Sequence, residues 1–137
     1  MTREVHVAEG ARIHSIADTP DRGTLVPVDV PTSNVHFIDL TKDPPVISEP
    51  PLHIDSPCEV LGVGVSNDGR FGVTSHLWSA STCFRKCFFD IENRIALSQY
   101  QLNGYQAFEV GFTRDGRKVI VGDFFGWGVL DRTVTAK

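Results

Sequence analysis

Cysteine and long apolar runs are scarce in this sequence. Its 137 residues include three cysteines, Cys58, Cys83 and Cys87. An odd number of cysteines without an export signal is typical of reduced thiols in the cytosol, so we expect a cytoplasmic location. The first residues, MTREVHVAEGARIH, lack the apolar core of a signal peptide, and no stretch approaches the length of a membrane span. The sequence therefore predicts neither export nor a membrane helix.

The spacing of two cysteines argues against a disulfide between them. Cys83 and Cys87 lie in a stretch, residues 82–89, that is rich in β-branched and aromatic residues and favours a strand. Residues four apart in a strand are about 13 Å from one another. A disulfide needs Cα atoms within about 7 Å. We therefore expect no disulfide and no metal here; a zinc site with His76 as an extra ligand is the alternative.

A strong excess of one charge sign is also missing. The chain has 13 Lys and Arg residues against 17 Asp and Glu residues, a formal net charge of −4. Nucleic acids and anionic membranes are bound mainly through Lys and Arg, so neither is expected as a partner. A local basic patch is possible, but scattered, solvated charges are the simpler interpretation. The candidates for the patch are Arg85, Lys86, Arg114, Arg117 and Lys118.

A repeat is the main feature that the sequence does contain. Asp21, Asp68 and Asp115 are spaced by 47 residues, and the segments around them align with one another. A period between 20 and 50 residues indicates a repeat architecture. We predict an N-terminal strand within residues 1–10, then three copies at 11–57, 58–104 and 105–137.

Each copy shows strand patterning and no sustained helical period. Residues 67–69 (NDG) of the second copy predict a type I′ hairpin turn. Small residues align in the first strand of each copy (Ala17, Gly64, Gly111), as expected where innermost strands crowd together. The predicted strands are 12–18, 25–30, 35–40 and 46–54 in copy one, 59–66, 70–75, 84–91 and 95–102 in copy two, and 107–113, 118–124 and 128–135 in copy three.

The third strand of each copy ends on an apolar pair followed by Asp, as in Phe88-Phe89-Asp90, where the Asp can stabilise the next turn. Together with SNDGR at 66–70 and TRDGR at 113–117, this pattern resembles WD40-like and YVTN-type bacterial β-propellers. The resemblance implies an all-β, β-propeller-like fold with about three four-stranded blades per chain. It leaves function open, because propellers serve as scaffolds, lectins, lyases and oxidoreductases.

Three blades are too few for a ring, since known propellers close with about four to eight. The third copy ends one strand short, and residues 3–8 form an unassigned strand before the first copy. We therefore predict a homodimer with six blades, in which each N-terminal strand completes the partner's third blade. The alternatives are another protein that supplies the missing blades, or a compact β-domain of another kind.

The loops between strands two and three, and between strand four and the next blade, share one face of a propeller. That face should carry the candidate binding residues, whose Trp, Gly and polar composition suits an interface or ligand pocket; Trp78 and Trp127 could instead pack as core. The candidates are His76, Trp78, Asp123, Phe125, Trp127 and, near the axis, His14.

No catalytic triad order, phosphate-binding glycine loop or paired-carboxylate motif is present, so no catalytic residue and no cofactor are predicted. We expect a non-enzymatic module that binds a protein or small ligand. One alternative is a small propeller enzyme of the lyase or lactonase type, with an axial histidine and acid or a metal. Another is a small acidic protein that neutralises a basic toxin.

Overall fold

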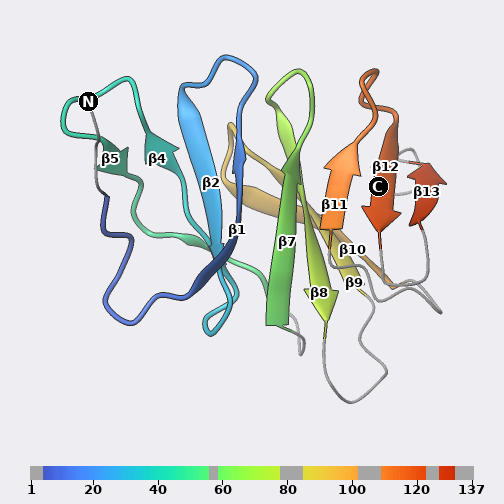
Figure 1. Ribbon diagram of the computed structural model, residues 1–137, viewed down its shortest axis with the longest axis horizontal. Coiled ribbons are helices and arrows are strands. Elements are labelled where there is room, and N and C mark those ends of the chain that lie inside the picture. Colours follow the sequence, from blue (N-terminus) through green and yellow to red (C-terminus); the bar gives the residue numbers. More distant parts are fainter. Residues whose placement is uncertain (1–4, 56–58, 78–84, 102–108, 123–126, 132–137) are drawn as a thin grey trace.

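The computed structural model describes residues 5–55, 59–77, 85–101, 109–122 and 127–131. All regular elements in these residues are strands, thirteen in total, arranged in three antiparallel sheets. The sheets stand one after another along the long axis of the molecule (Figure 1). We name them blade 1, blade 2 and blade 3 in chain order. The all-β, propeller-like fold expected from the repeat is confirmed.

Blade 1 has four strand positions, the outer two of which are interrupted. Strand β2 pairs with β1 on one side and with both β3 and β4 on the other, and these pair in turn with β6 and β5. Pro50 and Pro51 separate β5 from β6 at the sheet edge, where their missing donors cost no ladder hydrogen bond. The bounds are β1 (Ile13–Asp18), β2 (Thr24–Asp29), β3 (Asn34–Val35), β4 (Ile38–Asp39), β5 (Val46–Ile47) and β6 (Leu52–His53).

Blade 2 is the most regular sheet. Its four strands pair in the order β10-β9-β8-β7, close to the four ranges that the sequence predicts. Blade 3 shows three strands in the order β11-β12-β13 within the described residues. The bounds are β7 (Glu59–Val65), β8 (Phe71–Leu77), β9 (Arg85–Asp90), β10 (Ile95–Gln101), β11 (Glu109–Phe112), β12 (Lys118–Gly122) and β13 (Trp127–Asp131).

The innermost strands β1, β7 and β11 lie next to one another, as they do around a propeller axis (Figure 1). A Cβ added at Gly64 would lie 2.8 Å from the Val110 carbonyl oxygen and 3.0 Å from the Cα of Gly111. The expectation that small residues are needed on the first strand is therefore confirmed at this position. The apolar core fills both blade junctions, with Val26, Val63 and their neighbours between blades 1 and 2 and Val73, Val110 and theirs between blades 2 and 3.

The same hydrogen bonds recur in the three Asp-containing turns. In blade 2, the Ser66 hydroxyl donates to Asp68 Oδ1 over 2.6 Å, and this oxygen also accepts the backbone N–H of Arg70 over 3.0 Å. Thr113 and Asp115 repeat the arrangement in blade 3, and Thr19 and Asp21 in blade 1.

The predicted type I′ turn is corrected. The amide of Gly69 donates to the Ser66 carbonyl, and only Gly69 has positive φ, at 73°. Type I′ needs positive φ at both central residues, so this is a type I turn followed by a bulge glycine.

Residues 5–8 lie at the blade 1 end of the molecule, opposite blade 3 (Figure 1). Residues 5–8 belong to no strand in this chain, and a turn follows at Glu9 and Gly10. They therefore do not complete blade 3 of their own chain. Pairing of this segment with the third blade of a second copy stays a prediction.

Candidate functional site

Three of the six predicted binding residues lie outside the described part of the chain. Trp78, Asp123 and Phe125 lie outside the described residues, and Trp127 is described only as the first residue of β13. The assignment of these four residues to a binding surface stays a prediction.

His76 does not lie on an open surface. Its side chain is fully buried in β8, and its Nε2 is 2.7 Å from the hydroxyl of Thr74 on the same face of the strand. That face packs toward blade 1, because Cys87, the ladder partner of Thr74, belongs to the core between blades 1 and 2. A ligand at the loop face would not meet this imidazole directly.

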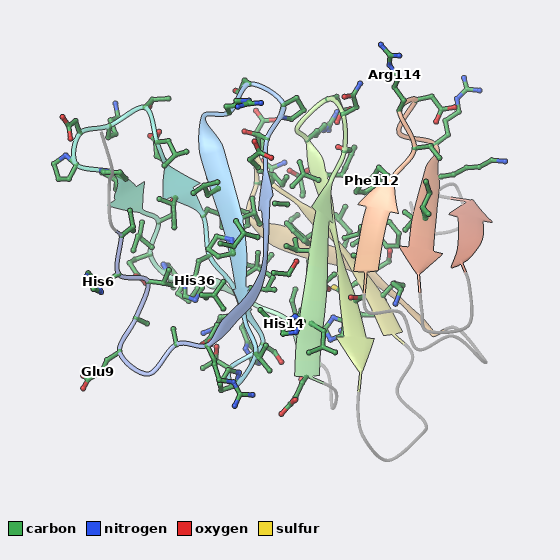
Figure 2. The ribbon with its side chains drawn as sticks, viewed as in Figure 1. His6, Glu9, His14, His36, Phe112 and Arg114 are labelled. Atoms are coloured by element: carbon green, nitrogen blue, oxygen red, sulfur yellow. The ribbon has the colours of Figure 1, made fainter. Side chains whose placement is uncertain are left out.

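His14 does lie at the predicted face. It is exposed at an irregularity of β1, and its Nδ1 is 3.0 Å from the carbonyl oxygen of Leu61 in β7 (Figure 2). A cavity of about 120 Å³ opens beside it and includes Arg12 and Glu59 among its lining residues. Known small-molecule pockets measure roughly 300–1,000 Å³, so this cavity admits no more than a small group.

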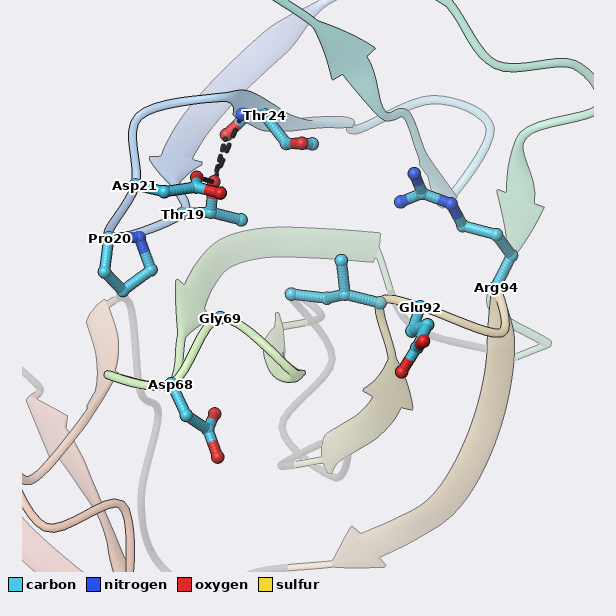
Figure 3. A pocket seen from close by; sticks show the side chains of 9 residues that line it. Thr19, Pro20, Asp21, Thr24, Asp68, Gly69, Glu92 and Arg94 are labelled. Atoms are coloured by element: carbon cyan, nitrogen blue, oxygen red, sulfur yellow. Dashed lines mark hydrogen bonds between the residues drawn. The ribbon is translucent and has the colours of Figure 1, made fainter.

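A larger groove of about 330 Å³ lies on the opposite face, where the Asp-containing turns project. Figure 3 shows three turns around it: residues 19–24 of blade 1, and residues 68–69 and 91–94 of blade 2. The turns of blades 1 and 2 are in close contact here, since a Cβ added at Gly69 would lie 3.4 Å from Pro20 Cδ and 3.8 Å from Thr19 Cβ. We call this cavity, lined by Thr19, Pro20, Asp21, Thr24, Asp68, Gly69, Ile91, Glu92 and Arg94, the turn-face groove.

The groove is lined by three carboxylates and one guanidinium. The hydrogen bond from Thr19, followed by that from the Gly23 amide, lowers the pKa of Asp21, so this carboxylate is ionised at neutral pH. Arg94 is the cation, and its guanidinium carbon lies 3.8 Å above the centre of the Phe37 ring. The stacking holds the cation against blade 1, while Glu92 projects from the same turn (Figure 3).

A second groove of about 260 Å³ repeats this arrangement between blades 2 and 3. It is lined by Asn67, Asp68, Arg114, Asp115 and Gly116, so Asp68 contributes to both grooves. The hydrogen bond from Thr113 lowers the pKa of Asp115, as its counterpart does for Asp21. Sequence reasoning assigned the repeated Asp residues to turn formation alone and did not foresee that neighbouring turns enclose grooves.

Comparison with known proteins identifies the fold. No family model and no curated protein matches the chain. Among solved structures, hydrazine synthase from Kuenenia stuttgartiensis superposes over 98% of this chain with a TM-score of 0.75 and 15% sequence identity. The chain spans 37% of the length of that protein, which contains a β-propeller. The fold is propeller-like. At this identity the likeness carries no information about activity.

A buried lysine is the polar feature that the sequence did not indicate. Lys86, taken above as a surface charge, is fully buried in β9, and its burial lowers its pKa to about 8. It shares a strand face with Phe88, whose side chain packs in the core between blades 2 and 3. The Lys86 side chain is therefore part of the packed interior on the blade 3 side of blade 2 and does not contribute to a surface basic patch.

Two further findings concern the described part of the chain only. It holds no group of three or more His, Cys, Asp or Glu side chains placed to bind a metal ion. None of its elements is a helix with the length and apolarity needed to cross a membrane.

Proposed function

We propose that this chain is a non-enzymatic binding module whose turn-face groove accepts a cationic side chain of a peptide or protein. The observation that supports the proposal best is the lining of the groove, with three carboxylates against one guanidinium in a cavity of about 330 Å³. That volume is at the lower end of the range for ligand pockets. An arginine or lysine side chain fits both the size and the charge.

The turns that form the groove are restrained before any ligand arrives. Asp21 accepts hydrogen bonds from the Thr19 hydroxyl and the Gly23 amide, and Asp68 accepts the equivalent pair in blade 2. Because these bonds hold the loops in one conformation, a ligand loses less free energy to ordering them. Preorganised carboxylates on a rigid scaffold support the binding of a cation.

The strength of binding is limited by solvent. Two unit charges 4 Å apart gain about 1 kcal/mol in water, and salt weakens exposed pairs further. A single arginine should therefore bind weakly and in a salt-dependent way. A partner that reaches both grooves would gain affinity, since linked contacts act at a raised effective concentration.

A titration with capped tetra-arginine, followed by amide chemical shifts, tests the proposal. Saturable shifts in the turns at 19–24, 67–70 and 91–94 are expected, with smaller effects from a tetra-citrulline peptide of similar shape and no charge. Glu92→Gln should weaken binding about two- to fivefold, the size of an exposed charge pair. Glu59→Gln is the matched control, because Glu59 lines the small cavity on the opposite face.

Two outcomes would refute this function. One is equal binding of the arginine and citrulline peptides. The other is an equal effect of the two Glu→Gln variants, which would show that net charge alone attracts the peptide. Membership of the WD40-like or YVTN-type group remains our proposal, supported by the repeated Asp-Gly turns, and does not depend on this test.

A further inference from the structure

The two outer blades each carry an exposed isoleucine at a position that is buried elsewhere in the repeat. Ile16 in β1 is 58% exposed. Its equivalents one and two repeats later, Val63 and Val110, are 7% and 9% exposed. Val63 packs between blades 1 and 2, and Val110 between blades 2 and 3. The position therefore faces the preceding blade, and in blade 1 none of the described residues covers it.

The opposite end of the arc shows the complementary pattern. Ile120 in β12 is 40% exposed, whereas its equivalents Val26 and Val73 are completely buried. Val26 faces blade 2 and Val73 faces blade 3. Ile120 thus occupies the position that packs against the following blade. The neighbouring residue Val119 points to the other side, into the junction with blade 2.

Charges flank the two isoleucines with opposite sign. Asp18 shares its strand face with Ile16, and Lys118 shares its strand face with Ile120; both are exposed. At the position of Asp18 the other repeats carry Val65 and Phe112, which pack against the cores of the two junctions. The end face of blade 1 therefore combines an exposed isoleucine with an acidic residue. The end face of blade 3 combines an exposed isoleucine with a basic residue.

We propose that a second copy of this chain covers both end faces, with blade 3 of each copy packing on blade 1 of the other. This inference goes beyond the proposed binding function and does not rest on it. The two internal junctions already show how such faces pack, so the closing junction continues an established interface. The described residues of one copy form three sheets, and rings have about four to eight blades, so two such copies fit whereas three would exceed that range. The two closing junctions are equivalent, as a two-fold axis requires.

The mass of the full chain in solution tests the assembly first. Sedimentation equilibrium at micromolar concentration should give twice the 15.1 kDa of one chain. Ile16→Asp and Ile120→Asp should each leave a folded monomer, because both side chains are already exposed. Ile95→Asp and Leu97→Asp are matched controls, since these residues are 50% and 41% exposed on the edge strand β10 and should leave the dimer intact. A monomeric wild type, or loss of the dimer in the controls as well, would overturn the proposal.

Charge reversal then distinguishes this ring from any other dimer. Asp18→Lys alone places like charges at both closing junctions, and so does Lys118→Asp alone. Each variant should therefore associate at least about fivefold more weakly than wild type, given the usual size of exposed charge pairs. An equimolar mixture restores opposite charges at both junctions of a heterodimer, so wild-type affinity should return. Failure of the mixture to associate better than either variant would show that these two faces do not meet.

Discussion

Substitution of one inner-strand glycine tests the close approach of blades 2 and 3. The Cβ of Gly64→Ala would lie 2.8 Å from the Val110 carbonyl oxygen and 3.0 Å from the Cα of Gly111. Both atoms belong to the backbone, so no side-chain rotation can relieve the overlap, and β7 and β11 must separate. Overpacking of this kind costs about 1–3 kcal/mol. We expect the free energy of unfolding in urea to fall by about 2 kcal/mol, with the slope of the transition unchanged.

Gly111→Ala is the matched control on the facing strand, with both glycine variants compared in the monomeric Ile120→Asp background so that no second copy covers Gly111. A Cβ at Gly111 would have no atom within 4 Å, and the residue does not have positive φ. Alanine also reduces the freedom of the unfolded chain, so this variant should be unchanged or more stable by up to about 0.5 kcal/mol. The reasoning fails if the two glycine variants lose the same stability, because the loss would then reflect strand composition and not contact between blades.

Three further substitutions test buried or strained groups. The stability of the wild type relative to Lys86→Met should rise between pH 8 and 10.5, because burial lowers the pKa of Lys86 from 10.5 to about 8. In that range the native lysine has lost its proton and the unfolded one has not. Arg22→Gly should raise the free energy of unfolding by about 1 kcal/mol, as measured by thermal unfolding. Arg22 has a φ of 58°, and the other copies have a glycine, Gly69 or Gly116, at this position. His36 is buried, and both its ring nitrogens are unpartnered within the described residues. Burial lowers the pKa of His36, so the unfolded chain takes up a proton more readily than the native protein. In acid titrations, the stability of the wild type should therefore fall more steeply below pH 6.5 than that of His36→Leu.

The strand order could be predicted because local chemistry fixes it. Asp68, with Ser66 before it and Gly69 after it, specifies a tight turn through side-chain hydrogen bonds that need no tertiary partner. Asp90 likewise accepts the backbone amide of Asn93 after the third strand, as its place in the sequence suggests. Turn signals of this kind recur every 47 residues. Their positions therefore predict where most strands begin and end.

Side-chain burial could not be predicted in the same way. In β8 the residues from Gly72 to His76 are all buried, because blade 2 has a neighbour on each face. A strand covered on both faces shows no alternation of polar and apolar residues. The sequence therefore gives no signal that the side chains of His76 and Lys86 are buried. The turn-face groove has no sequence signal for a related reason: it forms between two repeats, and the residues of neither repeat define it alone.

The two proposals can be separated because they involve different junctions. The turn-face groove lies between blades 1 and 2 of one chain, so a monomeric Ile16→Asp protein keeps it. Closing the ring adds junctions of the same type, at which the turn of Asp115 in one copy would lie next to the turn of Asp21 in the other. Peptide binding should therefore persist in the monomer, with fewer sites per chain than in the dimer. If the monomer bound no arginine peptide, the proposed role of the turn-face groove would be wrong.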